Sequence, residues 1–440
     1  MSNKKLTPKL RFPEFRKAGE WATEPMGNLY SFMRNNILSR DKLNYVSGTV
    51  KNIHYGDIHT KFPALFDITK ERVPFINPTE PVPPDDSEDY CVEGDLIFAD
   101  ASEDTNDVGK NIEIVKLNGE RLLSGQHTIL ARRNDDRIIV GFGGYLFRSG
   151  IIRSQIQRES QGTKVYQISS TRLANIEIAF PDEDEQRKIA DCLSSLDELI
   201  AAEGQKLESL RAYKKGLMQQ LFPRAGECVP QLRFPEFSDA GEWVAKPFED
   251  FVVRSFYGTS SSTSETGKYP VLRMGNMVDG ALVFSDLVYL DLDRESFENI
   301  RLIRGDILLN RTNSLDLVGK IAMFDRDIEC ITASYIVTYR LDTERFNPAF
   351  CNAMLNTPRY QAKIRLLARP SVSQANINPT TFKKELIVAV PSPAEQQRIA
   401  DCLSLLDAQI SAQSEKHAAL RTHKKGLMQQ LFPSTAEDEE

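Results

Sequence analysis

Polar residues 310–314, Asn-Arg-Thr-Asn-Ser, follow an apolar run and have side chains that could bind DNA. Arg and Asn can make two hydrogen bonds to one base edge, whereas Ser, Thr and Lys suit phosphate oxygens. We therefore predict that Arg311 and Asn313 contact base edges, with Asn310 and Thr312 beside them. A solvated surface turn is the alternative interpretation of the same residues.

Further polar segments of the second half could contact phosphates or bases. The loop 258–268, GTSSSTSETGK, is suited to wrapping around phosphates, although a low-complexity linker would have the same composition. Segments 273–276 and 369–374 follow or precede predicted strands. The predicted contacts in these segments and in the triplet 318–320 are Thr259, Ser260, Ser261, Arg273, Asn276, Lys320, Arg369, Ser371, Ser373 and Gln374.

The first half offers a different set of candidate DNA contacts. They are Lys51, His54, Tyr55, Ser102, Lys110, Gln126, His127, Lys164 and Tyr166. The two histidines lie in polar surroundings, so ordinary surface histidines are the alternative interpretation. The loop 101–107, ASEDTND, is acidic and unsuited to phosphate, so its carboxylates would accept from cytosine amino groups or contact a partner protein.

Motifs for catalysis and metal binding are missing from the sequence. It has no GxxxxGK(S/T) phosphate-binding loop. It also lacks the NPP(F/Y) run of adenine methyltransferases, because Asn347-Pro348 continues with Ala and Asn378-Pro379 with Thr. The six cysteines form no CxxC and no Cys/His cluster. We therefore predict a chain without catalytic residues, bound metal or bound cofactor.

Two long repeated segments must position these loops. Residues 185–223 and 395–433 are identical at 25 of 39 aligned positions. A shorter lead-in, LRFPEF…GEW at 10–21, returns at 232–243. Internal repeats of this kind indicate two copies of one unit, each made of a lead-in, a variable body and a long segment that ends in proline.

Apolar residues recur along each long segment in steps of three, four and seven, the heptad pattern of a helix packed along another helix. Each segment predicts a helix of about 38 residues, roughly 57 Å long, that ends at Pro223 or Pro433. We expect the two helices to pair in antiparallel orientation, and docking of each helix on its own body is the alternative. The predicted seam consists of Ile189, Leu193, Leu196, Ile200, Leu207, Leu210, Leu217, Ile399, Leu403, Leu406, Ile410, Leu420 and Leu427.

The bodies that precede these helices predict an α+β fold, with two mixed α/β domains related by pseudo-twofold symmetry. Short runs of alternating apolar and polar residues predict strands, and residues 142–156 predict a helix. The predicted strands are at 95–100, 112–117, 127–133 and 176–181, with the same plan at 267–277, 305–312, 331–341 and 386–391. The predicted domains are 1–182 (lead-in and first body), 183–222 (first helix), 223–392 (linker and second body), 393–433 (second helix) and 434–440 (acidic tail).

Short identical anchors occur inside both bodies. Gly94–Asp95 corresponds to Gly305–Asp306, and the triplet Val-Gly-Lys at 108–110 corresponds to 318–320. The loops between these anchors have unrelated sequences. A constant scaffold with divergent loops is typical of two domains that recognise different targets, and neutral drift after duplication is the alternative.

Composition limits the class of protein. The formal net charge of −7, to which the final AEDEE contributes −4, argues against a nonspecific nucleic-acid coat. DNA binding would therefore rest on local basic patches or on a basic partner. No apolar run approaches the roughly 20 residues that span a bilayer, and the N-terminal segment has no apolar signal core. We expect a cytoplasmic protein with no membrane partner.

The joint order of these features resembles the specificity subunit of type I restriction–modification systems. The resemblance rests on the duplicated EQ(R/Q)(K/R)IADCL…KKGLMQQLFP helices, the FPEF…GEW lead-ins and the GD(L/I)(I/L)…VGK skeleton, and it covers essentially the whole chain. It implies that each body is a target recognition domain for one half of a bipartite, asymmetric site in double-stranded DNA. It also implies that a helix pair fixes their spacing and docks methyltransferase subunits.

The same resemblance implies that the chemistry belongs to partner subunits. Two modification subunits would use S-adenosylmethionine to methylate adenine, and two restriction (motor-nuclease) subunits would use ATP and Mg. A coiled-coil scaffold joining two protein-binding bodies is an alternative that explains the seams and the negative charge, but not the Arg, Asn, Ser and Thr at the loop ends. A self-sufficient nuclease or methyltransferase is disfavoured by the missing motifs.

Overall fold

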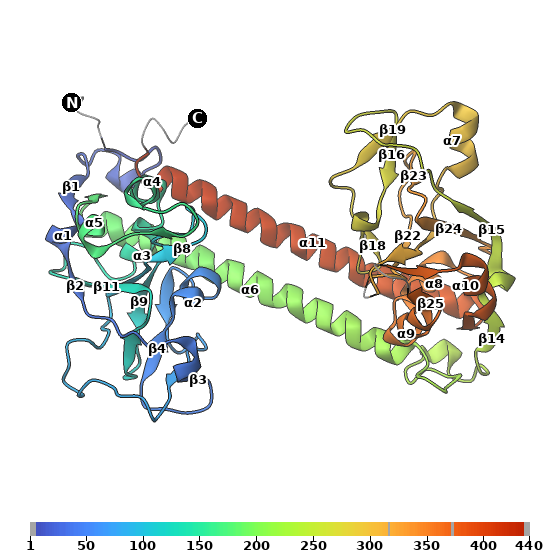
Figure 1. Cartoon of the computed structure of the whole chain (residues 1–440), viewed down its shortest axis with the longest axis horizontal. Helices are drawn as coiled ribbons and strands as arrows, with labels where there is room; N and C mark the ends of the chain where they lie inside the picture. The colour runs from blue at the N-terminus through green and yellow to red at the C-terminus, as the bar shows by residue number, and fades with distance from the viewer. Residues whose placement is uncertain (1–5, 316, 371–373, 435–440) are drawn as a thin grey trace. The chain divides into compact units, whose positions relative to one another are not determined.

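The computed structural model describes residues 6–315, 317–370 and 374–434. Contacts divide the chain into two compact units. Unit 1 comprises Met1–Gly204 and Lys416–Glu440, and unit 2 comprises Gln205–Glu415. Both units mix helices with small sheets (Figure 1), so the predicted mixed fold is confirmed.

The two predicted long helices are present. They are α6 (Glu183–Leu221, green in Figure 1) and α11 (Pro393–Leu431, red), each of 39 residues. Each helix begins in one unit and ends in the other. Every unit is therefore completed by the C-terminal part of the helix that starts in the other unit.

Unit 1 is built on a five-stranded sheet of order β2-β11-β7-β9-β5 and a four-stranded sheet of order β10-β4-β6-β3, with the two-stranded pairs β1-β13 and β12-β8. Its elements before α6 are η1 (Pro13–Phe15), β1 (Ala22–Pro25), α1 (Met26–Leu29), β2 (Tyr30–Met33), η2 (Arg40–Lys42), β3 (Leu43–Asn44), β4 (Lys51–Ile53), α2 (Tyr55–Thr60), β5 (Leu65–Asp67), β6 (Phe75–Ile76), β7 (Leu96–Ala99), β8 (Ala101–Ser102), β9 (Asn111–Lys116), β10 (Leu122–Ser124), β11 (Thr128–Arg133), α3 (Gly143–Leu146), α4 (Gly150–Glu159), β12 (Tyr166–Gln167), α5 (Ser170–Ala174) and β13 (Glu177–Phe180).

Unit 2 is built on a four-stranded sheet of order β15-β24-β20-β22 and two three-stranded sheets of order β19-β16-β23 and β21-β26-β25, with the pairs β14-β27 and β17-β18. Its elements before α11 are η3 (Pro235–Phe237), β14 (Val244–Pro247), η4 (Phe248–Phe251), β15 (Val252–Tyr257), β16 (Tyr269–Leu272), η5 (Met274–Asn276), β17 (Met277–Val278), β18 (Ala281–Leu282), β19 (Val288–Leu290), α7 (Arg294–Ile300), β20 (Ile307–Asn310), β21 (Thr312–Asn313), β22 (Ile321–Met323), β23 (Ile331–Thr332), β24 (Ile336–Leu341), α8 (Pro348–Leu355), α9 (Pro358–Leu366), β25 (Ala368–Pro370), β26 (Ala375–Ile377), α10 (Pro379–Glu385) and β27 (Ile387–Val390).

Four predicted elements are split in the structure. The predicted helix at 142–156 is the two helices α3 and α4, because Ser149 adopts an extended conformation before Gly150 and its hydroxyl donates to the Leu146 carbonyl. The run 331–341 forms β23 and β24, the run 305–312 contains β20 and the start of β21, and the run 267–277 contains β16, η5 and the start of β17. In each case the two strands belong to different sheets. An alternating pattern shows that a segment is extended, but it does not show where the segment changes partner.

The Gly-Asp anchors hold the same ion pair in both units. Asp95 accepts two hydrogen bonds from Arg132 at 3.1 and 2.9 Å, and Asp306 accepts two from Arg340 at 2.9 and 2.8 Å. Each carboxylate is fully buried and also accepts from a backbone amide three residues earlier. The anchor therefore ties the turn before one central strand to the neighbouring strand.

The glycine of each Val-Gly-Lys triplet is required by its backbone and its neighbour. Gly109 and Gly319 have φ angles of 65° and 85°, in the left-handed region. A Cβ atom would lie 2.7 Å from Ile156 in unit 1 and 2.6 Å from Ile364 in unit 2. The triplet is thus where α4 or α9 packs closely against the loop after the central strand.

The long helices contact each other in antiparallel orientation within each unit. In unit 1, Lys424 Nζ lies 2.5 and 2.6 Å from the Asp197 carboxylate oxygens, and Lys416 Nζ lies 2.5 Å from Glu203. In unit 2, Lys214 pairs with Asp407, which is the same lysine–aspartate pair with the two helices exchanged. The pseudo-twofold relation predicted from the repeat is therefore present in the side-chain contacts.

No seam residue is exposed. Ile189 and Leu193 are buried in the unit 1 core with Leu431 and Phe432 from the end of α11. The residues further along each helix are buried or half-buried. The first turns of each long helix therefore pack on a core, and the following turns contact the other helix. Both arrangements considered from the sequence are present on one helix.

Residues of the two lead-in motifs connect the core of each unit to the long helices. Arg11 donates to Glu185 and Arg233 donates to Glu395, in each case next to the first turn of a long helix. Trp21 packs edge-on against Phe432, and Trp243 packs likewise against Phe222. Within the described residues, no helix combines the length and apolar character needed to cross a membrane.

Candidate nucleic-acid interface

One end of the main sheet of unit 2 gathers most of the polar residues predicted for the second body. Strands β15, β24 and β20 are antiparallel neighbours, and their register places Tyr257 beside Val337 and Asn310 beside Ile336. The chain leaves β20 at this end, so Arg311 lies next to the start of β24. Sheet register therefore brings together residues that are far apart in the sequence.

Arg311 is held by its backbone and by an aromatic ring. Its amide donates to the Tyr335 carbonyl at 3.0 Å, and its carbonyl accepts from the Ile377 amide at 2.8 Å. Its guanidinium carbon lies 5.2 Å from the centroid of the Tyr257 ring, a cation–π distance. Among the described residues, the guanidinium has no hydrogen-bond acceptor, and its Nε atom is buried. The charged group is thus oriented, and its Nη atoms have no acceptor among the described residues.

Thr312 and Asn313 form β21, at the edge of the small sheet β21-β26-β25. The register aligns Thr312 with Asn376 and Asn376 with Arg369. Thr312 Oγ1 donates to Asn376 Oδ1 at 2.6 Å, while Arg369 is exposed. This sheet places Arg369 two strands away from the Arg311 loop.

Asn313 connects this sheet to the segment that carries Arg273. Asn313 Nδ2 lies 3.2 Å from the Met274 sulfur. Arg273 donates to the Asp286 carbonyl at 2.8 Å. Burial raises the pKa of Tyr335, and the nearby positive charge of Arg273 opposes that shift. Arg273 therefore lies on the same side of the unit as Arg311.

The polar loop after β15 begins at the same place. The Thr259 amide donates to the Thr332 carbonyl, and the Ser334 amide donates to the Thr259 carbonyl, both at 2.8 Å. Ser260 and Ser261 follow with exposed side chains. The start of the loop is therefore fixed to the residues that precede β24.

Two predicted residues of the second body make internal contacts, and a third is buried. Asn276 is buried, and its amide donates to two backbone carbonyls at 2.9 and 3.0 Å. Lys320 Nζ donates to the Met277 carbonyl at 3.2 Å. Asn310 is fully buried, and its side-chain amide has no partner in the part of the chain that the structure describes. Asn276 and Lys320 therefore hold the backbone of the site, and buried Asn310 does not lie on its surface.

Two of the remaining predicted residues cannot be placed. Ser371 and Ser373 lie outside the described residues. Gln374 lies next to β26 and is exposed.

The corresponding end of the unit 1 sheet holds histidines around Tyr55. The centroid of the Tyr55 ring lies 4.7 Å from His54, 6.0 Å from His59 and 5.4 Å from His127. Asp100 Oδ1 lies 3.3 Å from His127 Nδ1, an ion-pair distance without hydrogen-bond geometry. Across the described ranges, no three His, Cys, Asp or Glu side chains are grouped to hold a metal ion. The imidazole and carboxylate groups of the cluster can donate and accept hydrogen bonds, and its rings can stack on a base.

Burial and neighbouring charges set the protonation of this cluster. Burial lowers the pKa of His54, and Arg40 at 3.2 Å lowers it further. Neutral His54 caps α2 by accepting from the Gly56 amide at 3.2 Å. Burial raises the pKa of Asp100, and His127 opposes that shift. His127 is exposed at a φ of 57°, uncommon for a residue other than glycine, so the tight turn directs its side chain outward.

The other unit 1 candidates lie along the same edge. Ser102 pairs with Tyr166 across β8 and β12, and its hydroxyl accepts from the Asp104 amide at 3.1 Å. Lys164 is exposed two residues before β12, and Gln126 is half-buried in the turn that precedes β11. A side chain of the acidic loop 101–107 therefore binds a backbone amide of the same loop. Lys164 beside it remains accessible.

Two lysines predicted in the first body are engaged elsewhere. Lys51 Nζ lies 2.5 Å from Glu120 and over the Phe75 ring. Lys110 Nζ donates to the His59 carbonyl at 2.7 Å and lies 3.3 Å from Asp107. Neither ammonium group is a free cation for phosphate.

The two sites have one backbone frame and different side chains. The Asp100 amide donates to the His127 carbonyl at 3.1 Å, and its carbonyl accepts from the Ile168 amide at 2.9 Å. These are the bonds that Arg311 makes in unit 2. At the same backbone position, the side chain is therefore a carboxylate in unit 1 and a guanidinium in unit 2.

The sequence prediction missed four residues of these sites, Tyr257, Tyr335, His59 and Asp100. His59 could have been found, because it follows Tyr55 by four positions on a helix and such residues share a face. Tyr257 ends an alternating strand just before the polar loop, which is a weaker signal. The other two depend on strand pairing and have no local signal.

Comparison with known proteins places this arrangement in context. The family model described as type I restriction modification DNA specificity domain matches residues 68–212 and 243–421. The chain is 27% identical over 195 residues to the type I restriction enzyme MjaX specificity subunit of Methanocaldococcus jannaschii and 24% identical over 296 residues to the MjaVIII specificity subunit of that organism. These matches cover 43% and 66% of this chain and span 45% and 69% of the relatives' own lengths.

A solved structure has a similar fold. The crystal structure of a type I restriction–modification system S subunit from M. genitalium aligns with a TM-score of 0.59 at 14% identity, covering 98% of this chain and 100% of that one. At this identity the likeness concerns the fold alone.

Proposed function

The chain belongs to the type I restriction modification DNA specificity domain family, and from that premise we propose that each unit recognises one half of a bipartite site in double-stranded DNA. The observation that carries the proposal is the shared backbone frame with exchanged side chains at Asp100 and Arg311. Two domains that read different half-sites need a common scaffold and different groups at the base edges.

In unit 2, Arg311 is the proposed base-reading residue. Its guanidinium has no acceptor among the described residues and is oriented by the Tyr257 ring. Arg most often binds the O6 and N7 atoms of guanine with two hydrogen bonds. The other proposed contacts of this unit, to bases or phosphates, are Thr259, Ser260, Ser261, Arg273, Thr312, Asn313, Arg369 and Gln374.

In unit 1, the proposed contact surface is the edge around Tyr55 and His127. An exposed imidazole and a nearby carboxylate can hydrogen-bond to base edges, and Asp can accept from the cytosine amino group. The other proposed contacts are Ser102, Gln126, Lys164 and Tyr166. This surface has less positive charge than that of unit 2, so more of its affinity would come from hydrogen bonds and stacking.

Helices α6 and α11 would set the distance between the half-sites. Their length of 39 residues corresponds to roughly 58 Å at 1.5 Å per residue, and the Lys-Asp pairs specify one register. An insertion of four residues in each helix would add about 6 Å, close to two base-pair steps of about 3.4 Å. We expect the preferred gap in the DNA to lengthen by that amount, and an unchanged gap at full affinity would contradict the spacer role.

The helices would also dock the modification subunits. Leu199, Tyr213 and Leu405 lie outside the seam and expose 42%, 60% and 63% of their surface. Apolar groups on a helix surface that is otherwise polar suit a partner helix. The proposed complex contains two methyltransferase subunits that use S-adenosylmethionine and two motor-nuclease subunits that use ATP and Mg, and this chain would contribute recognition without catalysis.

The test starts from the modified genome. Mapping methylated adenines in the host with and without this gene should give one bipartite motif that disappears in the deletion strain. Binding of the chain together with its methyltransferase to duplexes carrying that motif should then be lost when either half-site is scrambled. A stable protein complex with no DNA preference would instead support a coiled-coil scaffold.

A further inference from the structure

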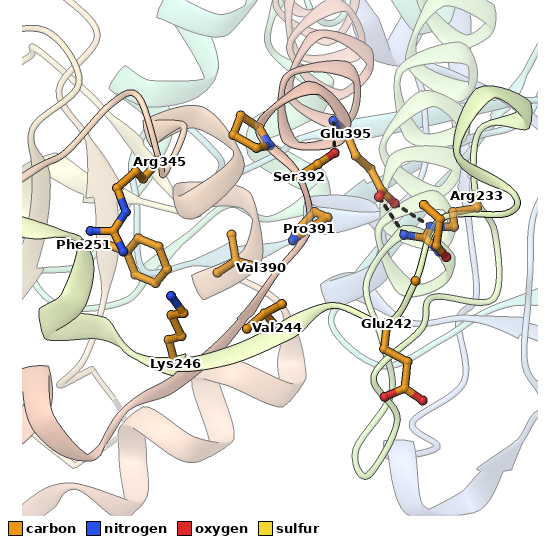
Figure 2. Close-up of a pocket in the computed structure, with 13 residues that line it drawn as sticks. Arg233, Glu242, Val244, Lys246, Phe251, Arg345, Val390, Pro391, Ser392 and Glu395 are labelled. Atoms are coloured by element: carbon orange, nitrogen blue, oxygen red, sulfur yellow. Dashed lines mark hydrogen bonds and ion pairs between the residues drawn. The ribbon is translucent and has the colours of Figure 1, made fainter.

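A pocket of about 390 Å³ lies in unit 2 where the lead-in meets the start of α11 (Figure 2). Its walls include the apolar side chains of Val244, Val390 and Phe251. Figure 2 shows the hydrogen-bonded pair of Arg233 and Glu395 on one side of these residues. That pair satisfies its own charges, so it does not determine what the pocket could bind.

Two cations, Lys246 and Arg345, lie on the other side of the pocket (Figure 2). Within residues 6–315, 317–370 and 374–434, the Lys246 side chain has no hydrogen-bond or ion-pair partner. Arg345 packs over the Phe251 ring at 5.3 Å, donates to a backbone carbonyl at 2.9 Å and lies 4.0 Å from Asp342, the limit of an ion pair. Glu242 also lines the pocket, but its carboxylate points away from the two cations in Figure 2.

The duplicated unit shows which group is missing here. The strand pairs β1-β13 and β14-β27 correspond, so Glu24 occupies in unit 1 the position of Lys246. Arg137 corresponds to Arg345, because the carbonyl of each accepts from the glutamine in the first turn of a long helix. In unit 1, Arg137 Nη1 lies 2.5 Å from the Glu24 carboxylate. Unit 1 therefore supplies its own carboxylate, and unit 2 has a second cation at that position.

We propose that this pocket of unit 2 binds a carboxylate of an acidic peptide segment from a partner protein, with an apolar side chain of the same segment on Val244, Val390 and Phe251. The incoming carboxylate would lie between Lys246 and Arg345 and would pair with Arg345 as Glu24 pairs with Arg137 in unit 1. A charge-assisted pair in a partly enclosed pocket is stronger than one on an open surface. The proposal assigns one peptide to each chain, because the unit 1 position is already neutralised.

DNA is a poorer occupant of this pocket. Phe251 immediately precedes β15 and Tyr257 ends it, so the pocket and the Arg311 site lie at opposite ends of the strand. Six residues of strand correspond to about 20 Å. The apolar walls also suit a peptide side chain better than a phosphate. The inference therefore does not depend on the proposed DNA contacts.

The test uses the full chain and a fluorescein-labelled peptide, acetyl-Glu-Leu-Asp-Leu-Glu, with binding followed by fluorescence anisotropy. Lys246→Glu should weaken binding by about tenfold or more, because it supplies the internal carboxylate that unit 1 already has. Lys246→Met should weaken binding as well, without adding a competing acid. Lys384→Glu is the matched control, since Lys384 is exposed on α10 outside the pocket, and it should change binding by about twofold or less.

Calorimetry should give one peptide per wild-type chain. Equal affinity in the wild type and in both Lys246 variants would overturn the proposal, and so would two peptides per chain. Displacement of the peptide by a short DNA duplex would assign the pocket to nucleic acid and overturn it. Self-association that Lys246→Glu abolishes, without peptide binding, would identify a second copy of the chain as the occupant and would also contradict the proposal.

Discussion

The candidate contact residues around Asp100 and Arg311, here called the tips, differ more between the two units than the sheets and buried ion pairs that carry them, here called the frames. Asp95–Arg132 and Asp306–Arg340 are the same bidentate ion pair, and each aspartate is fully buried. Five residues after each aspartate, the backbone makes the same two hydrogen bonds, but the side chain is Asp100 in unit 1 and an arginine in unit 2. The frame therefore specifies where a side chain projects, and the tip residue specifies what it can bind.

This difference implies that stability and specificity can be changed separately. Buried groups of the frame contact several strands, so their loss affects the whole unit. The tip of unit 2 rests on one ring and on backbone bonds that any residue would keep. Changes to the frames should therefore have larger effects than changes to the tips.

The largest effect is expected from the frame. Asp306→Ala leaves Arg340 without its carboxylate and removes an acceptor for the Ile303 amide. We expect the free energy of unfolding of unit 2 to fall by about 3–5 kcal/mol, as for other broken buried ion pairs. Asp95→Ala should have a similar effect on unit 1, measured by urea unfolding. A loss below about 1 kcal/mol in both variants would contradict the importance given to the shared frame.

A titration should distinguish the two frames. Glu113 in β9 is fully buried and accepts from the Gly141 and Gly144 amides at 3.0 and 2.7 Å, whereas the corresponding residue of unit 2 is Met323. Burial raises the pKa of Glu113 from 4.5 to about 7. The folded unit therefore binds this proton more tightly than the unfolded chain does. The stabilisation is fully present below pH 4.5, and it is lost as the pH rises through about 7.

We expect the free energy of unfolding of unit 1 to fall across this window by an amount on the order of 2–3 kcal/mol. Hydrogen exchange of peptides containing residues 139–147 should accelerate from pH 5.5 to 8 beyond the intrinsic base catalysis, while β22 of unit 2 serves as the internal control. The difference in unfolding free energy between wild type and Glu113→Gln should depend on pH. A constant difference across the window would contradict the raised pKa.

Local sequence patterns predicted the two long helices and several of the strands of both frames. The heptads predicted α6 and α11 because a helix in a helix pair buries a residue at every turn or every second turn, and the Gly-Asp anchors marked equivalent turns. Sequence could not predict that Asn276 and Lys320 make internal contacts, because their partners are backbone carbonyls brought close by tertiary folding. It could not pair Tyr257 with Arg311 either, since sheet register determines that contact.

A smaller, more specific effect is expected from the tip of unit 2. Arg311→Ala should cost about 1–3 kcal/mol in binding at one base position. Binding to duplexes with every single-base change in the half-site gives the measurement. The variant should retain wild-type discrimination at the other half-site, because unit 1 is unchanged.

The stability of Arg311→Ala provides the control for this measurement. It should unfold within about 0.5 kcal/mol of wild type, since the residue contributes no ion pair to the described part of unit 2. A uniform loss of affinity over all duplexes would identify Arg311 as a phosphate contact. That result would leave the base-reading role in unit 2 to Asn313 or Arg369.

The smallest effect should come from the ring beneath the guanidinium. Tyr257→Leu removes the cation–π contact with Arg311 at 5.2 Å, while Tyr257→Phe keeps an aromatic face. Such a contact contributes about 0.5–1 kcal/mol at an exposed site, so Tyr257→Leu should weaken binding by roughly two- to fivefold at the base position sensitive to Arg311. Tyr257→Phe should retain most of the affinity. In an Arg311→Ala background Tyr257→Leu should have no further effect at that position, because the ring acts through the guanidinium. An additive loss in the double variant would show instead that Tyr257 contacts DNA directly, and the orienting role would then be wrong.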